Sequence, residues 1–252
     1  MPSVGISMRM ETRIDIAMTE RQLCQSRSRA KLLITDGRVL LNHQICTKPS
    51  ALVSDSDLIE VEDLPFVGRG GLKLEGALKA FPVSPEHKIC LDIGASTGGF
   101  TDCMLKHGAE FVYAVDVGHD QLAESLKEHH QVKNLENTDI RNLNKSDFET
   151  LPEFCSIDVS FISLKYILPS AFALLADQAD CIALVKPQFE AGKIALNKQG
   201  IVKSEKIRIQ ILHEIEAFAV QTGFQVKASC ESPVQGGTGN IEYLLYLRKE
   251  SS

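Results

Sequence analysis

The stretch KICLDIGASTGGFT, residues 88–101, predicts a short buried strand that runs directly into a glycine-rich turn. The apolar residues Ile89, Leu91 and Ile93 alternate along the strand, and the turn carries three glycines, Gly94, Gly98 and Gly99. Glycine has no Cβ and can adopt positive φ, so backbone amides in such a turn can come close to a ligand. We therefore expect a ligand to rest against bare backbone here.

The surrounding sequence narrows the kind of ligand. The glycine spacing is not G-x-G-x-x-G and no Walker lysine follows, so neither a dinucleotide nor a nucleoside triphosphate is favoured. After the apolar run 111–115, a second strand ends in Asp116, where a doubly wound sheet places the acid that holds a ribose diol. No cluster of cationic residues accompanies this acid. These features predict a nucleoside without a polyphosphate, a description that S-adenosylmethionine fits.

Composition excludes several classes of protein. The chain has 252 residues, 44% of them hydrophobic, which is enough for one large domain or two unequal ones. A net charge of −6 argues against a uniformly basic nucleic-acid binder, although a local basic patch is compatible with it. Seven cysteines without a C-x-x-C pair favour neither a disulfide framework nor a metal site. No secretory leader or membrane-spanning run is evident, so a soluble cytoplasmic protein is predicted.

The first part of the chain predicts a disordered leader, residues 1–10, followed by a small α+β unit, residues 11–63. The unit opens with one apolar stripe, formed by Ile14, Ile16 and Leu23. Ser26 is a suitable N-cap for a helix that turns Ala30, Leu32 and Leu33 inward. The turn at Asp36-Gly37 leads into a strand at residues 39–41, and residues 58–61 close the unit as a last strand.

This unit resembles the RNA-binding module named after ribosomal protein S-four. The pattern is an Arg-x-Asp start, a Ser-Arg-x-x-Ala helix, a Gly-x-Val strand, a Lys-Pro and a closing strand. The corresponding features here are Arg13 with Asp15, Ser28 with Arg29 and Ala30 nearby, Gly37 with Val39, Lys48-Pro49 and residues 58–61. Two turns depart from the pattern, at Asn42-His43 and Ser56-Asp57. The resemblance implies RNA binding through cationic side chains, for which the candidates are Arg13, Arg27, Arg29 and Lys31. Arg69, in the segment that follows the unit, is a further RNA-binding candidate. The competing interpretation is that the basic residues form an ordinary solvated helix face.

After a predicted linker, residues 64–69, helices and strands alternate through residues 70–252 as a mostly parallel sheet requires. Strands are predicted at residues 88–95, 111–117, 132–136, 156–161, 181–186, 224–230 and 242–247. A long helix is expected from Ser204 to Thr222. The glycine-rich turn 236–240 joins the last two strands and predicts a hairpin, so the final strand should be antiparallel. This pattern is typical of the methyltransferase variant of the Rossmann fold.

Four charged residues stand where an open α/β sheet would bring them to its ligand-binding edge. Lys186 closes a buried apolar strand, which is a costly place for a lysine unless it is paired or active. Asp158 lies in the fourth strand region, and Glu242 begins the last strand. Lys73 stands in the first turn of a predicted helix that runs to Phe81, where the helix dipole disfavours a cation. We expect the four side chains to converge beside the nucleoside.

The order of these residues resembles the FtsJ-type ribose 2′-O-methyltransferases, whose catalytic tetrad is Lys-Asp-Lys-Glu. Five segments of the chain are similar to the TlyA family, which joins the RNA-binding module to such a domain. They are VGRGGLKLEGAL, LDIGASTGGFTDCML, DVSFISL, LVKPQFEAGK and SPVQGGTGNIEYLLYL. Together the two resemblances cover about residues 11–248. They imply that Lys73, Asp158, Lys186 and Glu242 are catalytic. They also imply S-adenosylmethionine as cofactor, at Asp92, Gly94, Ser96, Gly98, Gly99, Asp116 and Asp139, the last beside the adenine.

These residues suit an in-line displacement in which a ribose hydroxyl attacks a sulfonium methyl group, with Lys186 as the candidate base. The resemblance implies cytidine in ribosomal RNA as the target and ribosomal RNA or ribosomal subunits as partners. Methylation of an exocyclic amine is disfavoured, because Asp158-Val159-Ser160-Phe161 stands where such enzymes carry an Asn- or Asp-Pro-Pro-aromatic turn. A non-catalytic RNA-binding or ribosome-assembly factor would also be compatible with the two domains. A membrane-active haemolysin is less favoured, since no amphipathic basic helix supports it.

Overall fold

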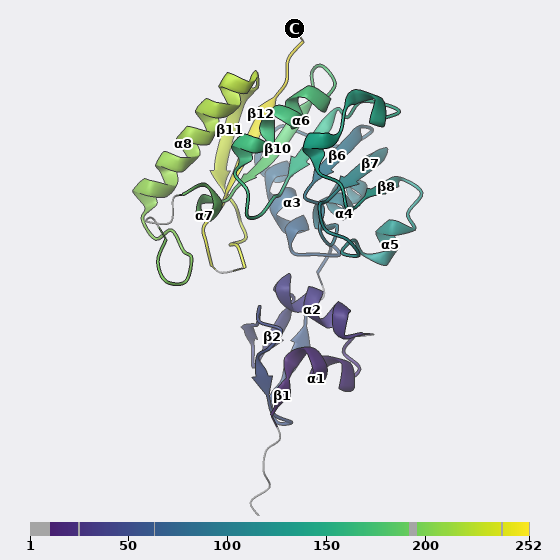
Figure 1. Cartoon of the computed structure of the whole chain (residues 1–252), viewed down its shortest axis with the longest axis vertical. Coiled ribbons are helices and arrows are strands. Elements are labelled where there is room, and N and C mark those ends of the chain that lie inside the picture. Colours follow the sequence, from purple (N-terminus) through teal and green to yellow (C-terminus); the bar gives the residue numbers. More distant parts are fainter. Residues whose placement is uncertain (1–10, 25, 63, 192–195, 238, 252) are drawn as a thin grey trace, which may run out of the picture. The chain divides into compact units, whose positions relative to one another are not determined.

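The computed structural model describes residues 11–24, 26–62, 64–191, 196–237 and 239–251, so the predicted leader lies outside the described residues. The chain divides into two compact units, and the division falls between Leu64 and Pro65 (Figure 1). Phe66, within the segment predicted as a linker, is 4% exposed and packs in the core of the larger unit. Each unit is described by itself below.

The smaller unit combines two helices with short strands among its described residues. The helices are α1 (Ile14–Glu20) and α2 (Arg27–Thr35). Strand β1 (Thr12–Arg13) pairs antiparallel with β4 (Leu52–Val53), and β2 (Val39–Leu41) lies between β3 (Gln44–Ile45) and β5 (Ile59–Val61). The predicted N-cap is confirmed, because Ser26 Oγ accepts a hydrogen bond from the Arg29 amide at 3.2 Å.

Apolar residues from both helices and from three strands form the core of this unit: Ile14, Ala17, Met18, Ala30, Leu33, Ile34, Val39, Val53 and Ile59. The predicted apolar stripe is wrong at Leu23, which is 36% exposed. Helix α1 ends at Glu20, so the helical period that would bury Leu23 stops before it. Strands β2 and β3 are joined by Asn42 and His43, both with positive φ, as in a tight type I′ hairpin turn.

The larger unit is built on a seven-stranded sheet formed by its described residues. The strands are β6 (Ile89–Ile93), β7 (Phe111–Val115), β8 (Val132–Leu135), β9 (Phe154–Ile157), β10 (Asp180–Val185), β11 (Gln225–Glu231) and β12 (Tyr243–Arg248). They lie in the order β11-β12-β10-β9-β6-β7-β8. Strand β12 is antiparallel to both of its neighbours and the other described pairs are parallel, which confirms the predicted antiparallel last strand.

One strand boundary differs from the prediction in a way that matters for the site. The fourth strand was expected at residues 156–161, but β9 ends at Ile157. Phe161 has a φ of 63°, a left-handed conformation that extended strand geometry does not allow. Asp158 therefore follows the strand at its carboxyl end and does not lie within it. Its amide donates to the Ile93 carbonyl at 2.9 Å, which holds the ends of β9 and β6 together.

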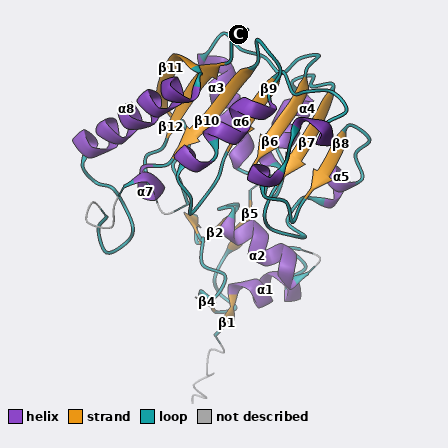
Figure 2. Cartoon of the chain, turned by 45° about the horizontal axis from the view of Figure 1, so that its top comes forward, coloured by secondary structure: helices purple, strands orange, loops and turns teal. Residues whose placement is uncertain are grey.

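Helices cover both faces of the sheet (Figure 2). On one face, α6 (Leu168–Leu174) and α8 (Glu205–Thr222) pack against alternate strand residues such as Leu91 and Ile93. On the other, α3 (Gly70–Ala80) and α4 (Gly99–Lys106) pack against Cys90 and its neighbours. Short helical segments complete the unit: α5 (Glu124–Lys127), α7 (Pro187–Glu190), and the 3₁₀ turns η1 (Ile140–Asn142), η2 (Lys145–Asp147) and η3 (Leu164–Tyr166). The two buried layers position the strand ends that carry the site.

The ends of α8 follow the sequence signals that predicted the helix. Ser204 Oγ accepts a hydrogen bond from the Ile207 amide, and Gly223, with a φ of 116°, ends the helix.

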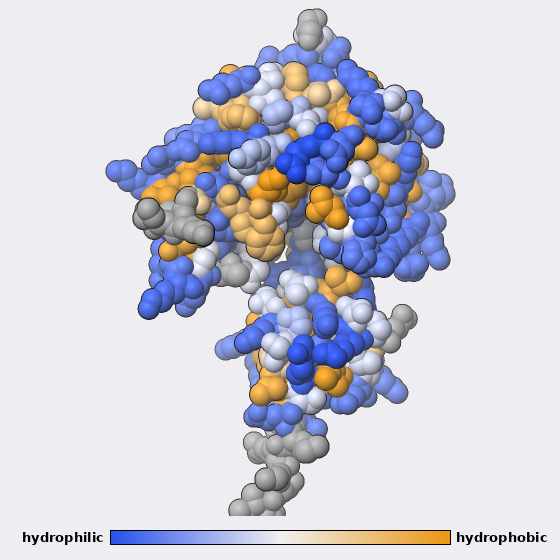
Figure 3. Space-filling view, in the orientation of Figure 1, coloured by the Kyte–Doolittle hydropathy of each residue, from blue (hydrophilic) through white to orange (hydrophobic). Residues whose placement is uncertain are grey.

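No helix in the described part of the chain is both long enough and apolar enough to cross a membrane. On the face drawn in Figure 3, hydrophilic residues cover much of the surface and hydrophobic ones lie between them. All seven cysteines are free thiols.

Candidate active site

The four residues predicted to be catalytic converge as two ion pairs. Lys73 Nζ lies 2.7 Å from Glu242 Oε2, and Lys186 Nζ lies 2.5 Å from Asp158 Oδ1. Each side chain is largely buried, with exposed fractions of 2–18%. In the first pair, Lys73 lies in α3 and Glu242 directly precedes β12. In the second pair, Lys186 directly follows β10 and Asp158 directly follows β9. Segments far apart in the sequence therefore meet at one edge of the sheet.

The register of the strands explains this convergence. Val185 at the end of β10 is paired with Tyr243 at the start of β12, so the next residues along, Lys186 and Glu242, lie at the same edge. Strand β9 runs parallel to β10 on its other side and delivers Asp158 to that edge. Helix α3 begins beside it, since a Cβ added to Gly70 would lie 3.8 Å from Asp158 Oδ2. Lys73 follows one turn later.

The charges of the two pairs act on one another. Burial by itself would raise the pKa of Asp158, but the ammonium groups of Lys186 and then Lys73 outweigh burial and hold the pKa below its usual value. Asp158 is therefore ionised at neutral pH. Because Lys73 contributes to this shift although its own hydrogen bond goes to Glu242, the two ion pairs form a single electrostatic cluster, which we call the tetrad.

The structure adds polar residues that sequence reasoning missed. Ser160 Oγ accepts a hydrogen bond from Lys186 Nζ at 2.9 Å, and Gln188 Nε2 donates to Glu242 Oε1 at 3.0 Å. Each of these residues stands two positions after a tetrad residue, which is the signal that could have identified them. Phe189, next to Gln188, has its ring 5.9 Å from Lys186 Nζ and in contact with the ring of Phe161, which is 91% exposed.

The glycine-rich turn lies beside the tetrad, at the point where the strand order reverses between β6 and β9. Open α/β sheets bind ligands at such points. Gly94 and Gly98 have φ values of 85° and 94°. A Cβ on Gly94 would come within 2.4 Å of the Asp158 carbonyl, and one on Gly98 within 2.2 Å of Leu126. Packing within the chain thus already requires both glycines, and their contact with a cofactor stays a prediction, as it does for Gly99.

Asp92 lies beneath this turn and is completely buried. Its carboxylate accepts hydrogen bonds from Thr101 Oγ1 at 2.7 Å and from Ser156 Oγ at 2.9 Å. Burial raises the pKa of Asp92 to about 7, even though both hydroxyls favour the ionised form. Because both oxygens are bonded to the chain's own hydroxyls, Asp92 links β6, β9 and α4 below the turn, and a direct contact with the cofactor stays a prediction.

The Asp92→Asn variant is expected to differ from the wild type in the pH dependence of its stability. Below pH 3.8 the carboxyl group is protonated in both states, whereas between 3.8 and about 7 only the folded state keeps the proton. The unfolding free energy of the wild type should therefore fall relative to the variant as pH rises through this window, by on the order of 4 kcal/mol, and then level off. Urea denaturation from pH 4 to 8 measures this difference, and parallel curves would contradict it.

Asp116 connects the glycine-rich turn to the loop after β7. Its Oδ2 accepts a hydrogen bond from the Ser96 amide at 2.8 Å, and its Oδ1 accepts one from the Gly118 amide at 2.7 Å. Glu136, which sequence reasoning missed, braces the same loop through the amides of Gln121 and Leu122. The carboxylate of Asp116 is half-buried at the carboxyl end of the strand next to β6, the position predicted for it.

Asp139 is the predicted cofactor residue farthest along the chain, in the loop after β8. Its carboxylate accepts hydrogen bonds from the Arg141 guanidinium, the shortest being 2.6 Å to Oδ2. These hydrogen bonds lower the pKa of Asp139. The carboxylate also caps the 3₁₀ turn η1 through the Arg141 amide at 2.9 Å. The group is ionised and fixed in place, and its position beside an adenine stays a prediction.

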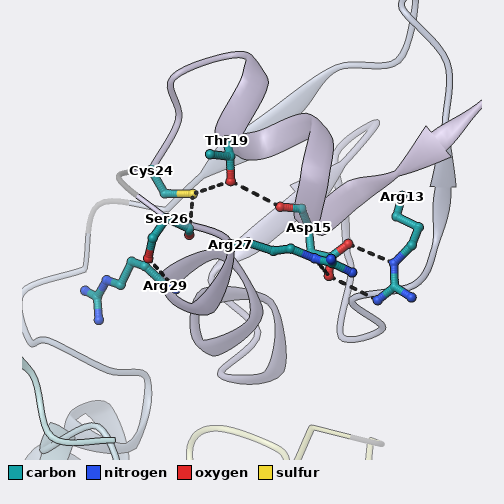
Figure 4. Close-up of polar contacts among 7 residues, drawn as sticks. All are labelled: Arg13, Asp15, Thr19, Cys24, Ser26, Arg27 and Arg29. Atoms are coloured by element: carbon teal, nitrogen blue, oxygen red, sulfur yellow. Dashed lines mark hydrogen bonds and ion pairs between the residues drawn. The ribbon is translucent and has the colours of Figure 1, made fainter. Parts of the chain in front are cut away.

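In the smaller unit, two of the predicted RNA-binding arginines converge on one buried carboxylate (Figure 4). Arg13 Nε lies 2.9 Å from Asp15 Oδ1, and Arg27 Nε lies 3.0 Å from Asp15 Oδ2. The hydrogen bond from Arg13 is the main reason that the pKa of Asp15 is lowered. Arg13 and Arg27 thus join β1 to α1 and α2. The Arg29 side chain points away from this cluster in Figure 4, and Lys31 is exposed.

Arg69 belongs to the larger unit. It is the N-cap residue of α3, directly before Gly70, and is half-buried. Because Gly70 approaches Asp158, the backbone of Arg69 lies near the tetrad. Its predicted contact with RNA would therefore be made at the methyl-transfer site.

The double variant Arg29→Ala, Lys31→Ala is expected to bind RNA more weakly than the wild type and to depend less on salt. Among the described residues neither cation has a carboxylate partner, so both can neutralise phosphates. The slope of log affinity against log salt should fall in magnitude by roughly 1.4–1.8. Filter binding over a salt series measures it, with Lys227→Ala, a cation of β11, as control. An unchanged slope would assign these residues to a solvated helix face.

The mostly parallel seven-stranded sheet, its antiparallel β12 and the tetrad at its edge define a Rossmann-like methyltransferase. Residues 66–249 match the FtsJ-like methyltransferase family, and residues 12–59 match the S4 domain. The chain belongs to the TlyA family, in which these two parts are joined.

The similarity to individual proteins extends over nearly the whole chain. The chain is 47% identical over 239 residues to YqxC of Bacillus subtilis, which is named as an rRNA methyltransferase. This alignment covers 93% of this chain and 85% of that protein. The chain is 37% identical over 247 residues to the 16S/23S rRNA (cytidine-2'-O)-methyltransferase TlyA of Mycobacterium tuberculosis, covering 97% and 92%. A solved structure named as a hemolysin, from Streptococcus thermophilus, is 45% identical with a TM-score of 0.77, covering 98% of this chain and 90% of that one.

Proposed function

We propose that this protein transfers the methyl group of S-adenosylmethionine to the 2′-hydroxyl of a cytidine ribose in ribosomal RNA. The observation that carries the proposal is the tetrad, in which Lys73, Asp158, Lys186 and Glu242 meet beside a glycine-rich turn and the Asp116 carboxylate. The named activity of the TlyA relative supports the choice of cytidine and of ribosomal RNA.

The residues present fit a nucleoside cofactor that carries no polyphosphate. Asp116 offers a fixed carboxylate to a ribose diol, because each of its oxygens already accepts one backbone amide and keeps a further lone pair. The turn from Gly94 to Gly99 and the ordered loop held by Glu136 would form the walls. When bound, S-adenosylmethionine supplies an electrophilic methyl group.

Lys186 has the central role in the proposed chemistry. A ribose hydroxyl is a weak nucleophile at neutral pH, so its proton must be removed as the new bond forms. Lys186 Nζ accepts that proton once it has released its own. Asp158 and Ser160 fix the direction of Nζ from two sides.

Orientation supplies the other part of the rate enhancement. Two reacting groups held in line can gain on the order of 7–11 kcal/mol relative to free encounter. Glu242 and Lys73 form a nearly buried ion pair beside Lys186. Because burial restricts both side chains, this pair is suited to orienting the target ribose. We assign RNA capture to the smaller unit, which ends at Leu64, and methyl transfer to the larger unit, which begins at Pro65, and we place the protein in the cytoplasm with its ribosomal substrate.

The test is methyl transfer in vitro with purified protein and S-adenosylmethionine carrying a tritiated methyl group. Naked ribosomal RNA and isolated ribosomal subunits serve as separate substrates, and digestion to nucleosides identifies the product. We expect 2′-O-methylcytidine, and greater transfer to subunits would identify them as the partner. Label in a methylated base, or no label in any RNA, would refute the proposal.

A further inference from the structure

Gln188 makes a contact within the tetrad that the proposed chemistry does not use. It lies in α7, two residues after Lys186, and its Nε2 donates to Glu242 Oε1 at 3.0 Å. The other oxygen of Glu242 accepts from Lys73 Nζ at 2.7 Å. The carboxylate, 2% exposed, is therefore held at both oxygens by different segments of the chain. Gln188 and Lys73 thus each hold one oxygen of the Glu242 carboxylate.

The other half of the Gln188 amide is unusual. Its nitrogen faces a carboxylate, which accepts hydrogen bonds only, so Oε1 must face the opposite way. That oxygen is buried and has no hydrogen-bond partner among the residues that the structure describes. A buried acceptor without a partner lowers folding stability. An apolar side chain of the same length would avoid this loss, so stability alone does not account for a glutamine at this position.

We propose that Gln188 is a positioning residue of the methyl-transfer site, which acts by orienting Glu242 and, through it, Lys73. This inference rests on the proposed function and adds a fifth residue to the tetrad. The donated hydrogen bond fixes the plane of the Glu242 carboxylate. That plane determines where the Lys73 ammonium lies relative to Asp158. The carboxylate of Asp158 interacts with the positive charges of both Lys73 and Lys186. Gln188 thus tunes the geometry of the cluster without touching the reacting atoms.

Gln188→Met tests this role, because methionine keeps the length of the side chain and removes both polar atoms. We expect kcat to fall about ten-fold, while KM for S-adenosylmethionine and for RNA stays within about two-fold. The midpoint of urea unfolding should change little, because the lost hydrogen bond to Glu242 Oε1 is partly offset by removal of the unpartnered Gln188 oxygen. Gln188→Glu should be slower still, because it places a carboxylate against that of Glu242.

The matched control is Gln210→Met. Gln210 Nε2 donates to Glu214 Oε1 at 3.1 Å on the exposed surface of α8, so it makes the same kind of contact far from the chemistry. This variant should retain the wild-type kcat. A Gln188→Met enzyme that turns over like the wild type, or one whose only defect is a lower unfolding midpoint, would overturn the inference. A wild-type enzyme that methylates no ribose would instead refute the proposed function and the role of Gln188 with it.

Discussion

Replacing Lys186 by alanine is expected to slow methyl transfer by orders of magnitude and to leave the affinity for S-adenosylmethionine nearly intact. If Lys186 removes the proton from the ribose hydroxyl, its contribution exists only in the transition state. General-base catalysis contributes typically 10²–10⁴-fold, so the single-turnover rate should fall by about that factor. Lys186→Arg should fail as well, because a guanidinium stays protonated at any working pH and cannot act as a base.

The measurement is single-turnover transfer to ribosomal RNA beside calorimetric titration of the cofactor. Removing Lys186 leaves the buried Asp158 without its 2.5 Å partner, so the single variant could lose stability for that reason alone. The double variant Lys186→Met, Asp158→Asn removes both charges together and separates folding from chemistry. Lys165→Ala, which breaks a wider surface pair with Glu214, is the control. An active Lys186→Arg enzyme would demote Lys186 from base to electrostatic support.

Asp116→Ala is expected to weaken binding of S-adenosylmethionine about ten- to a hundred-fold. A charged hydrogen-bonding partner of this kind is worth roughly 1.5–3 kcal/mol. The structure adds a second cause, because the alanine variant also releases the amides of Ser96 and Gly118 and so loosens the turn and the loop together. The loss should therefore lie toward the upper end of the range.

Calorimetric titration of the variants distinguishes these two causes. Asp116→Asn keeps one acceptor oxygen for a backbone amide and should bind with intermediate affinity. Asp120→Ala serves as control, since Asp120 lies in the same loop and its side chain is 86% exposed. If Asp116→Ala bound the cofactor as tightly as the wild type, the assignment of the ribose site to the end of β7 would have to be withdrawn.

Much of the larger unit could be predicted because its signals are local. Apolar runs between glycine-rich turns indicated all seven strands, and the turn at 236–240 indicated the antiparallel β12. Lys186 could be singled out because a lysine at the end of a buried apolar strand is unfavourable unless it is paired or catalytic. The fourth strand was predicted too long because Ser160-Phe161 looks extended in sequence, whereas Phe161 adopts a positive φ that ends it.

The sequence could not show which polar atoms meet. Asp92 was predicted as a cofactor residue, and its hydrogen bonds to Thr101 and Ser156 could not be foreseen from the sequence. Arg13 and Arg27 were predicted to bind RNA, and the carboxylate of Asp15 that they share could not be foreseen from the sequence. Such pairings depend on strand register and on the approach of one element to another, and neither is encoded in the identity of a single residue.

The place of β12 in the sheet has a consequence for how the protein is made. This strand comes last in the chain but lies between β10 and β11, and Glu242 beside it meets Lys73 across 169 residues. While the chain emerges from the ribosome, β10 and β11 each present an unpaired edge until residues 243–248 insert between them. The nascent protein thus depends on its final strand to close an aggregation-prone gap, and because Glu242 directly precedes that strand, we expect chains truncated before it to lack methyl transfer.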